Sequence, residues 1–417
     1  MTALARGAFR SLQSSNYRIW AAGALVSNIG TWMQRIAQDW LVLTQLTDHN
    51  ATAVGVVMAL QYGPHLVLLP LTGYAADLLD RRKLLLATQL GMSVLAAILG
   101  LLTITGTIRL WEVYVIALVQ GCITAFDAPA RHTFVAELVG ETDLPNAVAL
   151  NSTSFNAARM IGPAAAGLII AAVGSGWAFL INAASFVAVL GSLSLLRVED
   201  LHRSDKATRS RGGLVDGFRY VWRRPDLQTI LLMLFLIGTF GLNFPIFIST
   251  MSVTVFHAGA GEYGLLMSIM AIGTITGALL AAGRETPRFV YLITGAACFG
   301  LGCALASVTP NAWLFGATLV IIGVSALTFS NSTNSLMQLA TEPVMRGRVM
   351  AMRLAIALGG TPIGAPIVGF VADHYGPRWS LGVGAVAGLA AAMIGLLHLL
   401  RHGGQPRINQ ERGLPST

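Results

Sequence analysis

Charged side chains are scarce in this sequence: Asp, Glu, Lys and Arg make up 11% of its 417 residues, against 54% hydrophobic residues. A soluble domain of this length needs a charged coat of roughly a quarter of its residues. The few charges are clustered, and the clusters are separated by apolar stretches of about 20 residues, the length that spans a bilayer core. Most of these stretches lack the polar face that a helix of a soluble protein presents to water. The composition therefore predicts an all-α membrane protein.

Cysteine is equally scarce, and its placement offers no redox or metal chemistry. Cys122, Cys298 and Cys303 all fall in apolar stretches, without the spacing of a disulfide framework or a metal site, so we interpret them as packing residues. A nucleotide-binding glycine loop, a metal-ligand cluster and a Ser or Cys paired with a base are also missing. We therefore expect no catalytic residue, no metal, no cofactor and no enzyme activity.

The apolar stretches predict twelve membrane-spanning helices. The segment before the first, residues 1–17, is polar and basic and lacks the small-residue cleavage site of a signal peptide, so we expect the first span to be retained. The predicted spans cover residues 18–45, 53–76, 83–105, 110–127, 147–172, 176–196, 227–255, 262–283, 288–307, 312–335, 349–372 and 379–400.

The basic residues predict the orientation of these spans. With the N-terminus in the cytoplasm, Arg109 and Arg378 lie outside, Arg35 and Arg159 lie within spans, and the other 23 of the 27 Lys and Arg residues lie in cytoplasmic segments. The positive-inside rule demands such an asymmetry. We therefore expect a multi-pass protein of the inner (cytoplasmic) membrane with both termini in the cytoplasm. The net charge of +8 then reflects topology and anionic lipid, not nucleic acid.

The longest polar segment, rich in Arg, Ser and Gly, divides the spans into two sets of six. We expect an N-terminal six-helix bundle at residues 1–198 and a cytoplasmic linker at 199–225, which contains a short surface helix. A C-terminal six-helix bundle at 226–402 and a cytoplasmic tail at 403–417 follow.

A repeated pattern relates the two sets of spans. Residues 162–167 (Gly-Pro-Ala-Ala-Ala-Gly) recur as residues 364–369 (Gly-Ala-Pro-Ile-Val-Gly), at an offset of 202 (364 minus 162). At this offset Gly121 matches Gly323, Gly174 matches Gly376 and Trp177 matches Trp379. Because an even number of spans separates the copies, the sequence predicts two parallel, pseudo-symmetric six-helix bundles. In transporters with such parallel repeats, the substrate path lies between the halves.

The loop between the second and third spans resembles the signature of the major facilitator superfamily. Residues 73–83 read Gly-Tyr-Ala-Ala-Asp-Leu-Leu-Asp-Arg-Arg-Lys. The signature runs Gly, three residues, Asp, a basic residue, any residue, Gly and two basic residues, so Leu78 and Asp80 depart from it. Further matching segments make nearly the whole chain similar to the branch that includes the enterobactin exporter and related efflux proteins; these segments are residues 126–131, 147–151 and 346–350.

The resemblance implies the major facilitator fold with twelve helices and a gate at this loop. In the superfamily the loop aspartate, here Asp77, supports the closed cytoplasmic face at the start of the eleventh span, where the helix dipole stabilises a carboxylate. Gly73 lets neighbouring helices approach closely, and Arg81 and Arg82 complete the loop. The alternative is a charge cluster that only fixes topology.

The segment 162–167 resembles the antiporter motif of the superfamily, which reads Gly-Pro, two residues and two glycines; Ala166 departs from it. The resemblance implies that Gly162, Pro163 and Gly167 bend the fifth span and seal it against ion leak. Proline removes a backbone hydrogen bond, and small residues permit tight packing. The alternative is an ordinary kink of the fold, which the second copy at residues 364–369 favours.

Polar side chains mark the first span, and spacings of three and four place most of them on one stripe. They are Ser27, Asn28, Thr31, Gln34, Arg35, Gln38 and Asp39. Inside a membrane such a stripe must face water or another polar helix. Arg35 and Asp39 are close enough to pair at i and i+4. Our hypothesis is that Asp39 takes up the coupled proton and Arg35 senses its charge; a static ion pair is the alternative.

Arg159 in the fifth span either attracts an anionic substrate or pairs with Asp127 near the cytoplasmic end of the fourth span. Polar groups interleaved with aromatics also suit a cavity for amphipathic organic molecules, although such groups bond helices together as well. The candidates for lining the substrate cavity are Asn28, Gln34, Gln38, Asp127, Arg159, Asn243, Phe244 and Asn331.

The leading functional prediction is a secondary active transporter that exports a small organic molecule, a drug-like compound or a siderophore, in exchange for protons by alternating access. Direction and exchange rest on the resemblance and on residues 162–167. An importer or facilitator on the same fold is the alternative, and a non-transporting membrane protein is a remote one, since fold alone does not settle function. The expected partners are the substrate, protons and lipid, without nucleic acid, and we expect a monomer.

Overall fold

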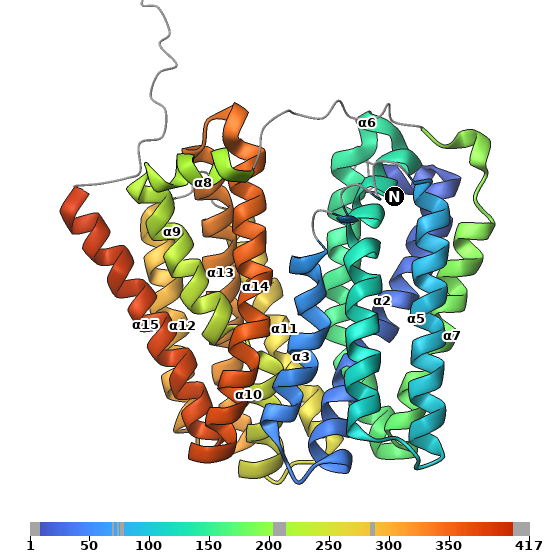
Figure 1. The fold of residues 1–417 in the computed structure, drawn as a ribbon, viewed down its shortest axis with the longest axis horizontal. Helices are drawn as coiled ribbons and strands as arrows, with labels where there is room; N and C mark the ends of the chain where they lie inside the picture. Colours follow the sequence, from blue (N-terminus) through green and yellow to red (C-terminus); the bar gives the residue numbers. More distant parts are fainter. Residues whose placement is uncertain are drawn as a thin grey trace, which may run out of the picture. The chain divides into compact units, whose positions relative to one another are not determined.

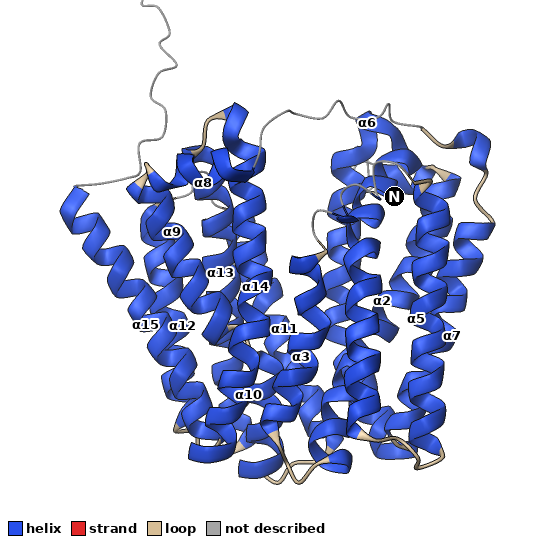
Figure 2. Ribbon diagram, in the orientation of Figure 1, coloured by secondary structure: helices blue, strands red, loops and turns tan. Residues whose placement is uncertain are grey.

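The structure of the chain, a computed structural model, describes residues 9–68, 71–72, 75, 79–202, 214–283 and 288–402. Within these residues the backbone is helical almost throughout and contains no strand (Figure 2). The helices of the first part of the chain (Figure 1) are α2 (Ser15–Leu41), α3 (Ala51–Val67), α5 (Arg81–Ile104), α6 (Leu110–Val173) and α7 (Ser175–Ser194). Those that follow are α8 (Leu214–Trp222), α9 (Pro225–Leu236), α10 (Phe244–Thr250), α11 (Ala260–Ala282), α12 (Phe289–Ser307), α13 (Ala312–Ala340), α14 (Pro343–Tyr375) and α15 (Pro377–His402).

Nine helical segments among the described residues are long and apolar enough to cross a membrane. One of them is α6, whose 64 residues far exceed the roughly 20 residues of a single crossing. Two helices that coincide with predicted spans fall outside the nine: α3 has only 17 residues, and a polar stripe makes α2 less apolar. The number of twelve spans stays a prediction. It would be reached if α6 crosses the membrane twice and α2 and α3 each cross it once.

Helix α6 is two helices joined at Gly140. This residue has φ +71° and ψ 179°, a conformation that glycine adopts without the steric cost that a Cβ imposes. Residues 128–146, expected as a loop between two spans, are helical on both sides of it. Phe134 and Leu138 of this extension are buried in an apolar core, and this packing stabilises helix beyond the predicted end of the span.

The seventh predicted span, residues 227–255, is not one regular helix. Helix α9 continues into a π-helical turn at Ile237–Gly241, and α10 continues into another at Met251–Val255. Pro245 in the first turn of α10 has no backbone N–H, so it cannot continue the hydrogen bonding of the preceding helix. Asn243 lies in the resulting break. Such π turns re-aim side chains, often at functional sites.

The chain divides into two compact units. The first comprises Met1–Arg209 with Ser252–Ser268, and the second comprises Ser210–Met251 with Ile269–Thr417. The segment Ser252–Ser268, which the sequence prediction assigns to the C-terminal bundle, therefore packs with the first unit. Residues 203–213 of the predicted linker and all of the predicted tail lie outside the described residues. Helix α8 forms the expected short helix in the linker.

Equivalent helices pack in the same way within each unit. In the first unit α5 packs against α6 and α7, and in the second α12 packs against α13 and α15. A Cβ at Gly121 would lie 2.6 Å from the carbonyl oxygen of Gln61 in α3. Its counterpart 202 residues on, Gly323, would place a Cβ 2.6 Å from the carbonyl oxygen of Met270 in α11. The internal repeat found in the sequence is therefore a repeat of helix contacts.

Large apolar side chains are exposed over both units. Leu168 and Leu279 are 71% and 69% exposed. Soluble proteins rarely leave extended apolar surface uncovered, whereas lipid tails are as apolar as these side chains. The exposed apolar faces are the surface that a bilayer covers.

Candidate functional site

Two arginines of the first unit gather at Trp32 of α2. The guanidinium carbon of Arg35 lies 4.8 Å from the centre of the Trp32 ring, and that of Arg159 in α6 lies 5.5 Å from it. Arg35 also donates a hydrogen bond to Tyr62 Oη of α3 at 3.3 Å. Among the described residues, neither arginine has a carboxylate within 4.0 Å. Cation–π contacts stabilise the charge by about 0.5–2 kcal/mol each but do not neutralise it.

Asp39 lies one helical turn beyond Arg35 and is buried, with 7% of its surface exposed. Tyr263 of α11 donates a hydrogen bond to Asp39 Oδ2 at 3.4 Å. The Tyr263 ring also stacks on that of Trp40, with the ring centroids 6.1 Å apart. A neutral phenol is thus the polar partner of this carboxyl group.

The predicted ion pair between Arg35 and Asp39 is not formed within 4.0 Å. Their spacing allows it, but the Arg35 side chain lies against Trp32 and Tyr62 instead. Trp32, Tyr62 and Tyr263 are the site residues that the sequence reasoning misses. Single aromatic residues in apolar spans have no motif that could have singled them out.

Asp127, a predicted cavity residue, belongs to a separate cluster deep in α6. Its Oδ1 accepts hydrogen bonds from two side chains of α5, Thr88 at 2.8 Å and Gln89 at 2.7 Å. Its Oδ2 accepts two from Arg131, at 2.8 and 3.1 Å, and Arg131 also donates to Asn28 Oδ1 at 3.3 Å. The predicted alternative in which Arg159 pairs with Asp127 is therefore wrong, because Arg131 on the same helix already neutralises this carboxylate.

The two glutamines of the α2 stripe bond to other helices. Gln34 is buried and accepts a hydrogen bond of 2.5 Å from Asn182 of α7. Gln38 is equally buried and accepts one of 3.3 Å from Gln61 of α3, while its Nε2 has no hydrogen-bond partner among the described residues. Gln34 therefore serves helix packing, whereas Gln38 keeps a free donor one residue before Asp39.

The antiporter-like segment packs on α2 and on the part of α11 that belongs to the first unit. A Cβ at Gly162 would lie 2.6 Å from Trp32 Cβ in α2, and one at Gly167 would lie 2.7 Å from the carbonyl oxygen of Ala260 in α11. Gly264 of α11 in turn approaches the backbone of Pro163. The small residues of this segment thus allow backbone-to-backbone contact on both sides.

The loop at residues 73–83, which is predicted to act as a gate, is described only in part. Gly73 and Asp77 lie outside the described residues. Arg81 forms an ion pair with Glu137 of α6, and Arg82 donates hydrogen bonds of 2.7 and 3.2 Å to the carbonyl oxygens of Leu193 and Ser194 in α7. The basic end of the loop therefore ties the start of α5 to its neighbours in the first unit.

The remaining cavity candidates lie in the second unit. Asn243 is fully buried and donates a hydrogen bond to the carbonyl oxygen of Thr239 at 2.7 Å, while its Oδ1 accepts none within the part of the chain that the structure describes. Phe244 packs edge-on against Phe247 and Phe299. Asn331 is half-buried in α13. The eight candidates therefore do not form one cluster: Arg159 belongs to the Trp32 group, whereas Asn28 and Asp127 both contact Arg131.

Known proteins similar to this chain are transporters. Residues 6–413 match the family described as "Transmembrane secretion effector". The chain is 27% identical over 367 residues to the multidrug efflux pump Tap of Mycolicibacterium fortuitum, covering 85% of this chain and 88% of that protein. It is 24% identical over 379 residues to the enterobactin exporter EntS of Citrobacter koseri, covering 90% and 89%.

Among solved structures, that of the nucleoside transporter NupG matches with a TM-score of 0.71 at 15% identity, over 93% of this chain and 99% of that one. This likeness shows the fold, and the all-α membrane architecture of the major facilitator type is confirmed. The family match extends over nearly the whole sequence, which confirms the resemblance of the chain to this superfamily. The chain belongs to the transmembrane secretion effector family of the major facilitator superfamily, and it is a multi-pass membrane transporter of small molecules rather than an enzyme.

Proposed function

We propose that the protein exports a small organic molecule, a drug-like compound or a siderophore, in exchange for protons, and that Asp39 is the residue that takes up the proton. The observation that carries the proposal is the environment of Asp39, a buried carboxyl group whose polar partner is a neutral phenol. An isolated ionised carboxylate is costly in a low-dielectric surrounding. Asp39 therefore holds a proton in this arrangement and loses it when water or a cation reaches it.

Alternating access supplies the second arrangement. Tyr263 belongs to the short segment Ser252–Ser268, which a long stretch of sequence separates from α2. Movement of this segment away from α2 removes the phenol from Asp39 and admits water, so the proton leaves on the other side of the membrane. The packing of Gly162 and Gly167 on α2 and α11 keeps ions out while Asp39 is protonated.

The substrate meets the aromatic and charged group around Trp32. The rings of Trp32 and Tyr62 offer flat apolar contact, and Arg35 and Arg159 offer hydrogen-bond donors. Pockets that combine apolar surface with a few oriented polar groups bind amphipathic organic molecules. Two relatives are named after the transport of such compounds, one as a multidrug efflux pump and the other as an enterobactin exporter.

The remaining features belong to the same proposal. Gly73 and Asp77 close the cytoplasmic side together with Arg81 and Arg82. The protein lies in the inner membrane with both termini in the cytoplasm, and it acts as a monomer, because one chain contains both units.

The test uses purified protein in liposomes with a pH-sensitive dye inside, and ethidium and enterobactin as probes. In the wild type, an imposed pH gradient drives accumulation of at least one probe. Asp39→Asn keeps the shape of the side chain and the Tyr263 contact but cannot release a proton, so accumulation falls to the level measured without a gradient. Asp48→Asn, at a solvent-exposed carboxylate, leaves accumulation unchanged. Full gradient-driven accumulation by Asp39→Asn rules out the proposed role.

A proton-coupled importer is the second candidate. It is favoured by Arg35 and Arg159, which have no carboxylate within 4.0 Å among the residues that the structure describes. They attract an acidic substrate, and protonation of Asp39 strengthens that attraction by removing the negative charge next to Arg35. Substrate and proton then bind together and travel in the same direction. Protonation of Asp39 has the opposite effect on a basic substrate: it weakens binding, because the proton and the substrate compete for the same carboxylate. Exchange requires this competition.

Probe affinity measured above and below neutral pH separates the two modes. Exchange predicts tighter binding at the higher pH, and co-transport predicts tighter binding at the lower pH. Arg159→Gln weakens the binding of an acidic probe by about tenfold, because it removes one charged hydrogen bond of roughly 1.5 kcal/mol. The binding of a basic probe is unchanged or becomes tighter. An acidic probe that binds Arg159→Gln as well as the wild type excludes direct recognition by Arg159.

A further inference from the structure

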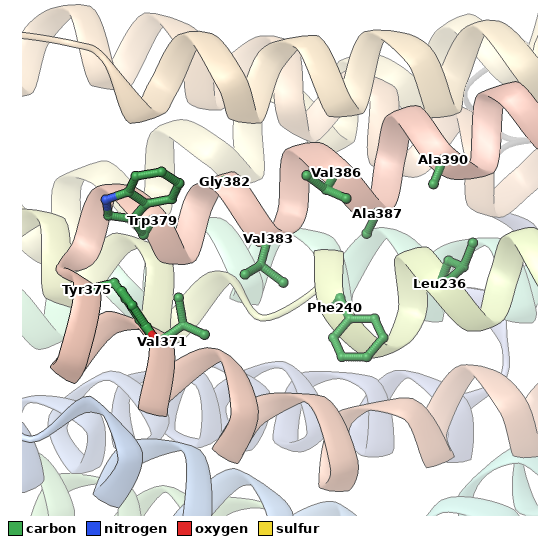
Figure 3. Close-up of a pocket in the computed structure, with 10 residues that line it drawn as sticks. All are labelled: Leu236, Phe240, Val371, Tyr375, Trp379, Gly382, Val383, Val386, Ala387 and Ala390. Carbon is green, nitrogen blue, oxygen red and sulfur yellow. The ribbon is translucent and has the colours of Figure 1, made fainter.

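An apolar groove of about 810 Å³ runs along the second unit. It lies between α15, the end of α14, and the junction of α9 with the π turn that follows it (Figure 3). Phe240, Val383 and Leu236 point into it, and Trp379 and Tyr375 lie at one end. The residues that line it are Leu236, Phe240, Val371, Tyr375, Trp379, Gly382, Val383, Val386, Ala387 and Ala390.

The groove exists because α15 has small residues where it faces α14. Gly382, Ala387 and Ala390 leave space that larger side chains would fill. A Cβ at Gly382 would meet only one atom within 4 Å, Cε3 of Trp379 at 3.9 Å. Neither the backbone nor a neighbouring helix therefore closes the groove at this point.

One side of the groove opens onto the surface that lipid covers. Tyr375, Trp379 and Val386 are 68%, 66% and 68% exposed although they line it. None of the lining side chains is charged, and the polar atoms of Tyr375 and Trp379 are confined to one end. Tyr and Trp at one end of an apolar surface are typical of the depth at which lipid headgroups begin.

Arg378 lies beside this aromatic end. Its guanidinium donates hydrogen bonds of 2.8 and 3.0 Å to the carbonyl oxygens of Ser307 and Thr309. These bonds fix the side chain at the end of α12, but they use two of its five N–H groups and leave its positive charge. A fixed guanidinium with free donors is suited to a phosphate oxygen.

We propose that this groove binds one acyl chain of an anionic phospholipid whose phosphate lies at Arg378. The length of the groove agrees with the length of a lipid acyl chain in one leaflet of the bilayer. Trp379 and Ala390 lie about 16 Å apart along α15 at 1.5 Å per residue, close to half of the roughly 30 Å hydrocarbon core. The apolar lining takes the methylene groups, the aromatic end marks the headgroup level, and Arg378 selects a negative headgroup.

The test is native mass spectrometry of the full-length protein in detergent, titrated with phosphatidylglycerol and with phosphatidylcholine. The wild type retains one phosphatidylglycerol in preference to phosphatidylcholine. Gly382→Leu fills the groove and weakens retention by about tenfold, the effect of excluding roughly two methylene groups. Arg378→Gln removes the preference for phosphatidylglycerol while the uncharged part of the binding remains.

Matched variants serve as controls. Gly191→Leu places the same side chain at a helical glycine of α7 that has nothing within 4 Å, and Arg109→Gln removes the other arginine predicted outside. Both retain the lipid as the wild type does. Quenching of tryptophan fluorescence by phosphatidylglycerol brominated on its chains, compared between the wild type and Trp379→Phe, reports the same contact without filling the groove.

Three results would overturn the proposal. The first is equal retention of phosphatidylglycerol by Gly382→Leu and Gly191→Leu. The second is quenching that does not change in Trp379→Phe. The third is a protein dimer that Gly382→Leu dissociates, since a second copy of the chain would then occupy the groove.

Discussion

Gly162 shows how one residue sets the distance between two helices next to the site. A Cβ there would lie 2.6 Å from Trp32 Cβ and 3.0 Å from the carbonyl oxygen of Ile29, both well inside van der Waals contact. The two backbones therefore touch, and this contact positions the tryptophan ring on which Arg35 and Arg159 lie.

Gly162→Ala is expected to destabilise the protein, because overpacking of a close contact costs about 1–3 kcal/mol. The control is Gly191→Ala, which adds the same atom where nothing lies within 4 Å and is expected to stabilise helix by about 0.5–1 kcal/mol. Thermal unfolding in detergent measures both. Equal midpoints for the two variants would show that the close approach at Gly162 does not hold.

At this scale the sequence predicts which polar residues are placed in the membrane but not which ones meet. Spacing of i and i+4 permits an Arg35–Asp39 pair, and only the side-chain rotamers direct Arg35 to Trp32 and Tyr62. Asp127 and Arg131 have the same spacing, and in their case the ion pair does form. Tyr263 reaches Asp39 from a segment 224 residues away, which hydropathy and motifs do not reveal.

At the scale of single elements, glycine and proline decide where helices break. Gly140 interrupts α6 through a positive φ, and Pro245 accompanies the break before α10. Hydropathy locates the apolar part of each span but not its end, because a helix continues wherever packing against its neighbours buries its side chains. The expected loop at residues 128–146 is helical for this reason.

Gly140→Ala should lower the free energy of unfolding. With ψ near 180°, a φ of +71° lies in a region that is almost restricted to glycine, so a Cβ there costs about 1–3 kcal/mol. The new atom would also lie 3.3 Å from the His202 ring. Gly283→Ala, at the end of α11 with no atom closer than 3.9 Å, is the control and should be close to neutral. Chemical denaturation of the two variants, compared with the wild type, decides the point.

At the scale of the whole molecule, the repeat is what the sequence predicts best. Glycines 202 residues apart make the same kind of contact in each unit, as Gly121 and Gly323 do, and Gly174 and Gly376 end their helices with φ of +91° and +98°. Close contacts and positive φ admit few other residues, so these positions survive while the apolar residues around them differ. The substrate-binding residues cannot be predicted in this way, because Ser, Asn and aromatic residues line cavities and also pack helices together.

The central claim is that this transporter moves its substrate out of the cell in exchange for protons. Inside-out membrane vesicles that contain the protein, acidified inside and given ethidium or enterobactin outside, test it most directly. Proton-coupled export predicts accumulation of a probe in the vesicles that collapses when the pH gradient is dissipated and is absent in Asp39→Asn. Accumulation that persists without the gradient, or efflux of preloaded probe from the vesicles when the interior is made acidic, would contradict it.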